Sequence, residues 1–126
     1  MVKLGRNRIV YKKVYIREKN QVRTVRDRCD IIATLRIPKG AWVRESIDRV
    51  GNISILHLRK NRASKAKVLK LEQNNKLINK AHSGYNQRFI YQVGRIVVPK
   101  RAFNTRDIHC ASGIHFFKHR QDAKNY

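Results

Sequence analysis

The sequence predicts an α+β fold, a single compact β-rich domain over residues 1–126 with one or two short helices. Three observations support this prediction. The length of 126 residues suits one domain of ordinary size. A hydrophobic fraction of 41% is enough to build one core. Runs rich in Val, Ile and Tyr, of the length of a strand, outnumber helical patterns, and no internal repeat or linker divides the chain.

The first half of the chain contains three predicted strands. Residues 8–16 (RIVYKKVYI) are rich in Val, Ile and Tyr, and residues 30–37 (DIIATLRI) form a β-branched run that stops at Pro38. The pair Gly51-Asn52 indicates a turn, which leads into a third run at residues 53–58 (ISILHL).

Strand patterns continue in the middle of the chain and are interrupted by one polar segment. Residues 65–72 (KAKVLKLE) alternate until Leu69, so they predict a strand with a β-bulge. Residues 73–87 are mostly polar, and we expect a long exposed loop there. Residues 88–98 predict another strand, in which Gly94 indicates a bulge or a tight turn.

The two ends of the chain differ in character. Residues 113–117 (GIHFF) predict a short strand, and residues 120–126 predict a helix with Asp122 in its first turn, where a negative charge suits the helix dipole. The basic segment 1–28 is one that a partner could order. No apolar run approaches the roughly 20 residues of a membrane helix, and the first residues lack a secretory signal, so we expect a soluble intracellular protein without a membrane span.

The charge is the strongest functional signal in the sequence. Thirty Lys and Arg against eight Asp and Glu give a net charge of +22. Charge repulsion in so small a protein opposes compaction unless anions share the surface, and these anions are phosphates, an acidic protein face or anionic lipid. Nucleic acid is favoured on charge alone. The candidate residues for binding an acidic partner or nucleic acid are Arg6, Arg8, Lys12, Lys13, Arg17, Arg59, Lys60, Arg62, Lys65 and Lys67.

Metal and catalytic motifs are weak. His109, Cys110, His115 and His119 include zinc-ligand types, but their spacing matches no standard pattern, so we expect no metal and no cofactor. Cys29 and Cys110 are interpreted as reduced thiols. The phosphate-binding glycine motifs are missing from the sequence, and its carboxylates are widely spread. We therefore expect no catalytic residues.

Three aromatic residues are expected to be buried. Trp42 follows a turn and is interpreted as a core or interface anchor rather than as a stacking platform for bases. Phe116 and Phe117 lie in an apolar run and are expected to join the core.

The segment 91–126 resembles a domain of unknown function that is widespread in giant DNA viruses and often attached there to pentapeptide-repeat arrays. Segments 11–14, 35–38 and 62–69 are similar to its opening and middle. Asn61 stands where the family pattern has Cys, so a function that needs two paired thiols is not expected. The resemblance implies a large DNA virus as the source and supplies no activity. The matching residues of the closing segment are Tyr91, Gly94, Val97, Phe103, Cys110, Gly113, Ile114, His115, Phe116, Phe117, Ala123 and Tyr126.

The same closing segment also resembles the Gly-Ile-Tyr-Phe-Ala…Ala-x-Tyr segment of ADP-ribosyltransferases. Those enzymes need a glutamate downstream of the segment, and this sequence ends at Tyr126. We therefore treat an ADP-ribosyltransferase-like enzyme, or an inactive relative of one, as the least favoured hypothesis.

The sequence thus supports three hypotheses. The leading one is a non-enzymatic protein of the virion, a minor capsid or cementing component that binds capsid or other virion proteins through its positive surface and is found in the host cytoplasm during assembly. The second is a sequence-nonspecific protein that binds DNA or RNA. The third is the ADP-ribosyltransferase-like enzyme.

Overall fold

The computed structural model describes residues 2–16, 31–45, 61–84, 88–99 and 113–126. These residues form a β-rich domain with one short helix, which confirms the β-rich character that the sequence predicts. The predicted strand at 53–58 lies outside the described residues. The elements are β1 (Val2–Lys3), β2 (Arg8–Val14), β3 (Ile31–Ile37), β4 (Trp42–Arg44), β5 (Asn61–Ala63), β6 (Ala66–Gln73), β7 (Lys76–Ile78), β8 (Lys80–His82), β9 (Ile90–Gln92), β10 (Ile96–Val97), β11 (Ile114–Phe116) and α1 (Arg120–Asn125).

The largest sheet is built on the three longest described strands. Its order is β10-β6-β3-β2, with β7 also paired to β6, and each pair is antiparallel. The predicted strands at 8–16, 30–37 and 65–72 are confirmed as β2, β3 and β6. Their apolar side chains alternate toward one face, where Val10 lies opposite Leu35 and Leu35 lies opposite Val68, all three buried.

The predicted β-bulge is confirmed at Leu69. Thr34 lies opposite Lys70 and Leu35 lies opposite Val68, so the register shifts by one residue on β6. Because of this extra residue, Val68 and Leu71 both face the core, although their spacing breaks strict alternation.

The predicted long loop at 73–87 is wrong over most of its described length. The chain turns tightly at Asn74 and Asn75, whose φ angles are +48° and +66°, and returns as β7 and then β8. Asn adopts positive φ more easily than other non-glycine residues, so this polar pair closes a hairpin. The segment is polar because the hairpin lies at the protein surface, where Leu77 is 74% exposed.

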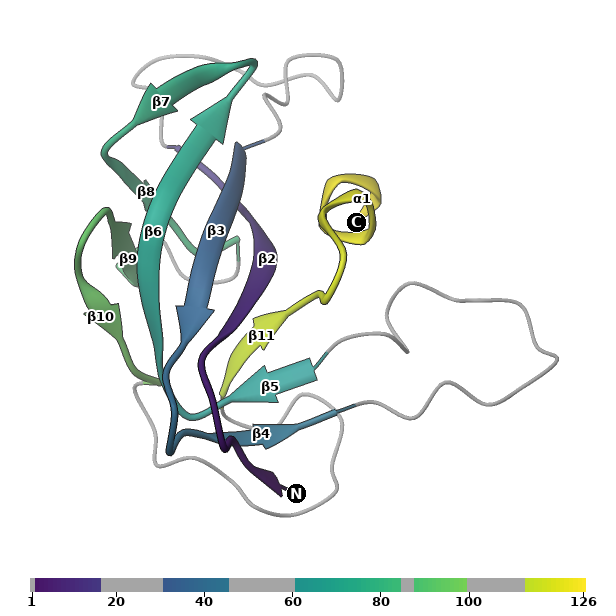
Figure 1. The fold of residues 1–126 in the computed structure, drawn as a ribbon. Coiled ribbons are helices and arrows are strands. Elements are labelled where there is room, and N and C mark those ends of the chain that lie inside the picture. The colour runs from purple at the N-terminus through teal and green to yellow at the C-terminus, as the bar shows by residue number, and fades with distance from the viewer. Residues whose placement is uncertain (1, 17–30, 46–60, 85–87, 100–112) are drawn as a thin grey trace, which may run out of the picture.

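A second sheet of four short strands brings together distant parts of the chain. Its order is β1-β4-β5-β11, and all three pairs are antiparallel. Figure 1 shows β4 and β5 crossing below the upright strands β2, β3 and β6, with β11 leading from this sheet toward α1. The predicted strand at 113–117 is confirmed as β11.

Two backbone bridges join the sheets along the outer edge of β2. Tyr11 exchanges two hydrogen bonds with Phe117, just after β11, and Tyr15 exchanges two with His82, at the end of β8. A turn at Gly94, with a φ of +86°, lets the chain leave β9, which pairs with β8, and enter β10, which pairs with β6. The expectation of a tight turn at this glycine is confirmed.

The predicted helix is confirmed as α1, with Asp122 in its first turn. Ala123 is its buried residue and packs with Phe117 and Ile32 against the face of β2 and β3 that points away from the main core. The helix therefore covers part of the outer face of the large sheet.

The main core lies between the two sheets and confirms two of the three aromatic expectations. Phe116 and Phe117 are 0% and 4% exposed. Trp42 is 45% exposed, so its predicted place in the core is wrong, and the alternative of an interface anchor stays a prediction. The reason is the alternation of β4, because Val43 occupies the inward position and the Trp42 ring lies outside, with the Lys3 ammonium 6.0 Å from its centroid. Among the described residues, no helix is long and apolar enough to cross a membrane.

Candidate functional site

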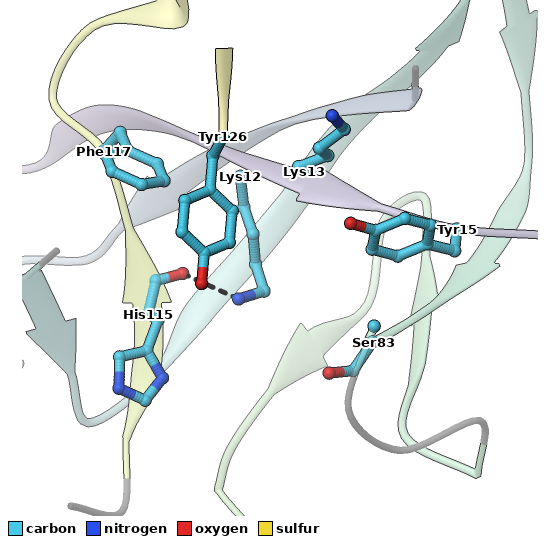
Figure 2. A pocket seen from close by; sticks show the side chains of 8 residues that line it. Lys12, Lys13, Tyr15, Ser83, His115, Phe117 and Tyr126 are labelled. Atoms are coloured by element: carbon cyan, nitrogen blue, oxygen red, sulfur yellow. Dashed lines mark hydrogen bonds between the residues drawn. The ribbon is translucent and has the colours of Figure 1, made fainter. Parts of the chain in front are cut away.

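A pocket opens beside β2 between the two backbone bridges that tie this strand to Phe117 and to His82. Its volume is about 170 Å³. Figure 2 shows its walls, which come from β2, from the turn after β8, and from the end of the chain around β11 and α1. The lining residues are Lys12, Lys13, Tyr15, Ser83, Gly84, His115, Phe117 and Tyr126.

Lys12 places the positive charge at the centre of this pocket. Its ammonium Nζ donates a hydrogen bond to the carbonyl oxygen of His115 at 3.0 Å. Figure 2 shows the Lys12 side chain extending past Tyr126 toward His115, whereas the side chain of Lys13 points the other way. This is the alternation expected of neighbouring residues on a strand.

Aromatic rings form the two sides of the pocket. Tyr15 stacks on His82, with ring centroids 6.4 Å apart and an interplanar angle of 27°. Phe117 contacts Tyr126 with centroids 5.4 Å apart. Figure 2 shows the Tyr15 and Tyr126 rings on either side of the Lys12 side chain. The pocket therefore combines aromatic side chains with the two cations Lys12 and Lys13.

Gly84 is required by the closeness of the Tyr15 ring. A Cβ at position 84 would lie 2.5 Å from Cε2 of Tyr15, which is inside van der Waals contact. Any side chain at this position would therefore displace the ring and change the shape of the pocket.

The eight lining residues include no Asp or Glu. Their polar side chains are ammonium, hydroxyl, phenol and imidazole groups, which donate hydrogen bonds to anions. The pocket is therefore suited to a ligand that carries negative charge.

A row of basic residues crosses the four-stranded sheet next to this pocket. Arg44 lies directly opposite Arg62, and Arg62 lies directly opposite His115. Arg62 is only 3% exposed. Burial and the nearby charge of Arg44 lower the pKa of the Arg62 guanidinium below its usual value. Cross-strand neighbours of like charge destabilise a sheet, so this row has an electrostatic cost.

Glu45 neutralises part of the charge between the sheets. Its carboxylate accepts hydrogen bonds from Arg8 at the start of β2 and from Lys118 after β11, the latter at 3.1 Å. Burial by itself would raise the pKa of Glu45, but these bonds and the two positive charges lower it below the usual 4.5.

The candidate cations do not form one surface. Lys12 and Arg62 come together through His115, and Lys13 lines the same pocket. Arg6 and Lys65 are exposed in connections between strands, Arg8 is paired with Glu45, and Lys67 lies opposite Arg36 on β6 and β3. The remaining candidates, Arg17, Arg59 and Lys60, lie outside the described residues.

The residues of the closing segment divide between core and pocket. Ile114, Phe116, Phe117 and Ala123 are buried, and His115 and Tyr126 line the pocket. Cys110 and His109 lie outside the described residues, in which no group of three potential metal ligands occurs.

Sequence reasoning missed Tyr15, Ser83 and Gly84 as pocket residues. Tyr15 was interpreted as an ordinary aromatic residue of a strand, and Ser83 and Gly84 lay inside the expected loop. The single local signal was the glycine, because a glycine in a polar segment marks either a turn or a close approach.

Comparison with known proteins matches the chain to one family model and to one viral protein. A family model described as "Family of unknown function (DUF5758)" matches residues 3–123. The chain belongs to this family. It is also 30% identical over 131 residues to the uncharacterized protein L223 of Acanthamoeba polyphaga mimivirus, an alignment that covers 93% of this chain and 81% of that protein. No solved structure matches the chain.

These findings confirm the expected kinship with a family of unknown function found in giant viruses. Two parts of the expectation stay predictions. One is that the closing motif is characteristic of the family, and the other is that members of the family are often attached to pentapeptide-repeat arrays.

Proposed function

We propose that the protein is a non-enzymatic structural component of a large DNA virus particle, and that it binds acidic partner proteins through its positive surface. The family and its mimivirus relative support a viral source. The net charge of +22 supports a partner that supplies negative charge. In this role the protein is made in the host cytoplasm and incorporated during assembly.

The observation that carries the proposal is the pairing of cations with cations in both sheets. Arg44 lies opposite Arg62 in the small sheet, and Arg36 lies opposite Lys67 in the large one. The Nε atom of Arg36 is buried without a hydrogen-bond partner. Like charges in cross-strand pairs are unfavourable, and an acidic partner offsets that cost.

Two of the protein's carboxylates in the described segments already contact two cations each. Glu45 binds Arg8 and Lys118. Glu72 contacts Lys70 at 3.1 Å and Arg120 at 3.9 Å. These two acids therefore contribute little further neutralisation, which favours an external source of negative charge.

The test is to count this protein against the major capsid protein in purified, nuclease-treated particles by quantitative mass spectrometry. We expect a fixed ratio with many copies per particle that survives nuclease. Salt should release the protein less steeply than it releases a polyphosphate complex, because each phosphate contact adds a slope of roughly 0.9 on a log–log plot. Absence from the particle would overturn the structural role.

A second candidate function, sequence-nonspecific binding of nucleic acid, is favoured by the position of Trp42. Its ring is 45% exposed and lies beside the Lys3 ammonium, an arrangement that suits stacking on a base next to a phosphate. Its test is the dependence of DNA and RNA affinity on salt, in which a log–log slope near zero would contradict this function. The ADP-ribosyltransferase-like hypothesis stays a prediction, tested by whether NAD binds and whether His115→Ala abolishes the binding.

A further inference from the structure

The outer face of the large sheet carries a row of four side chains, one from each of the strands β2, β3, β6 and β10 (Figure 1). Ile9 lies directly opposite Arg36. Arg36 lies opposite Lys67, and Lys67 lies opposite Ile96. Each of the four is next in the chain to a residue buried in the main core, so alternation directs this outer row to the opposite face of the sheet.

The outer row is accessible from solvent. Ile9 and Ile96 are 46% and 62% exposed, although both are large apolar side chains. The helix α1 covers the same face farther along β2 and β3, where Ala123 packs with Ile32 and Tyr11. The outer row therefore lies beside α1 and is left uncovered by it.

The centre of the outer row brings two positive charges together. Among the described residues, neither Arg36 nor Lys67 contacts a carboxylate. The Nε atom of Arg36 is also buried without a hydrogen-bond partner. Like charges directly opposite each other on a sheet are unfavourable, and carboxylates placed over this pair would offset that cost.

We propose that the outer row binds an acidic amphipathic helix of a partner protein. Two carboxylates of that helix lie over Arg36 and Lys67, and an apolar side chain on either side of them contacts Ile9 and Ile96. This inference rests on the proposed function, because it gives the chemistry of the acidic partner and the place where that partner binds.

The spacing of the outer row matches a helix that lies across the strands. Neighbouring strands are about 4.8 Å apart, so the four positions lie at about 0, 5, 10 and 14 Å along the row. Helical residues separated by three, four and three positions share one face and lie at about 0, 4.5, 10.5 and 15 Å along the axis. On one face of an extended segment, side chains recur about every 6.7 Å, which does not fit the row.

Charge and hydrophobicity together disfavour the other occupants. A second copy that docks through its own outer row would place two more cations on Arg36 and Lys67, which like-charge repulsion opposes. Nucleic acid would neutralise the two cations, but Ile9 and Ile96 would then face a charged backbone and gain little from it. An acidic amphipathic helix is the occupant that uses all four side chains.

The first experiment compares two synthetic helical peptides of equal composition and charge on the unaltered full-length protein. In the matched peptide, Leu, Glu, Glu and Leu share one face at spacings of about three, four and three residues. In the control peptide the two leucines lie on the opposite face. Fluorescence anisotropy of the labelled peptides should show about tenfold tighter binding of the matched peptide, because only this peptide buries its leucines against the isoleucines. Equal affinities would overturn the proposal.

A pair of apolar variants locates the contact. Ile96→Thr keeps a β-branched side chain on β10 and removes apolar surface, so the preference for the matched peptide should fall from about tenfold to about threefold or less. Leu77→Thr is the matched control, because Leu77 is 74% exposed and lies on β7, outside the row. This control should keep the preference, and an equal loss in both variants would overturn the proposal.

A pair of charge variants tests the cations of the row. Lys67→Gln should weaken binding of the matched peptide by about threefold at physiological salt. Lys80→Gln is the matched control, since Lys80 is an exposed lysine on β8, and should weaken binding by about 1.3-fold at most. Equal effects would assign binding to net charge and overturn the proposal. Circular dichroism checks that each variant is folded, and the peptide comparison on the unaltered protein does not depend on any variant.

A labelled single strand of DNA separates nucleic acid from an acidic protein at this place. Ile96→Thr should leave the affinity for the strand within about 1.3-fold of the original, because phosphate contacts do not need the isoleucine. A loss as large as that of the matched peptide would assign the outer row to nucleic acid and overturn the proposal.

Failure of this inference is distinct from failure of the proposed function, because the peptide comparison needs no virus particle. A protein that is present in particles at a fixed ratio but shows no preference for the matched peptide overturns the inference alone. A protein that shows the preference but is absent from particles overturns the structural role alone and supports the inference.

Discussion

The two larger sheets of this protein are stabilised in different ways. The large sheet is built on β2, β3 and β6, strands of seven, seven and eight residues that bury aliphatic side chains such as Val10, Leu35 and Val68. The small sheet has strands of two or three residues drawn from the beginning, middle and end of the chain. It carries the basic row of Arg44, Arg62 and His115.

Because of this difference, the stability of the two sheets should be sensitive to different kinds of mutation. The large sheet depends on apolar volume, because burial of side chains such as Leu35 is its main source of stability. The junction with the small sheet depends on charge, because Glu45 binds Arg8 of the large sheet and Lys118 in the segment after β11. Mutations in the two regions should therefore respond differently to pH and salt.

The largest expected effect is in the centre of the large sheet. Leu35 is 0% exposed and lies opposite both Val10 and Val68. Leu35→Ala should lower the free energy of unfolding by about 3 kcal/mol, through lost burial and the cavity that remains. Urea denaturation measures this value. Leu77→Ala is the control, since Leu77 is 74% exposed, and should change stability by less than about 0.5 kcal/mol. Equal losses in the two variants would contradict the proposed importance of apolar volume.

The second-largest expected loss of stability is at the turn between β6 and β7, at the edge of the large sheet. Asn75 has a φ of +66°, a conformation that β-branched residues strongly disfavour. Asn75→Val should lower the free energy of unfolding by about 1.5 kcal/mol, whereas Asn75→Gly should retain at least the stability of the original protein. Both values come from urea denaturation. If Val and Gly give the same stability, the positive φ at this position is wrong.

The strands of the large sheet could be predicted because their information is local. Runs of β-branched residues predicted β2 and β3, and the broken alternation at Leu69 predicted the bulge in β6. The hairpin after Gln73 was missed because its pairing uses backbone groups, which a polar sequence does not reveal. The orientation of Trp42 was missed because a three-residue strand shows too little alternation to say which face is inward.

The pocket could not be predicted from the sequence for a different reason. Lys12 and Lys13 were recognised as cations, but their aromatic neighbours depend on long-range pairing. The bridge between Tyr15 and His82 brings together residues far apart in the chain, and the bridge between Tyr11 and Phe117 does the same from the other end. Such contacts follow from the arrangement of the sheets, which local patterns do not determine.

The junction between the sheets should respond to pH in a way that the apolar core does not. The pKa of Glu45 is lowered in the folded protein, so its contribution to stability is present above the usual pKa of 4.5 and is lost as the pH falls through the lower folded value. Because the carboxylate is partly exposed, Glu45→Gln should lower the free energy of unfolding at pH 7 by only about 1 kcal/mol.

Urea denaturation at pH 7 and at pH 3 measures this difference between the original protein and Glu45→Gln. The gap should shrink at pH 3, where protonation removes the same charge from the original protein. Leu35→Ala is the control, since its loss comes from burial and should stay similar at both pH values. A Glu45→Gln effect that does not change with pH would mean that Glu45 acts by packing and not through its charge.

The smallest expected effect tests whether charge also matters within the large sheet. Lys67 lies directly opposite Arg36, so Lys67→Gln removes one member of a like-charged pair. This variant should be more stable than the original protein by about 0.3 kcal/mol at low salt, and the gain should disappear near 1 M salt. Lys70→Gln is the matched control on the same strand, because Lys70 is 3.1 Å from a Glu72 oxygen and its loss should give no gain. A gain of equal size in both variants would show that stability follows net charge, and that the position of each cation on the sheet has no separate effect.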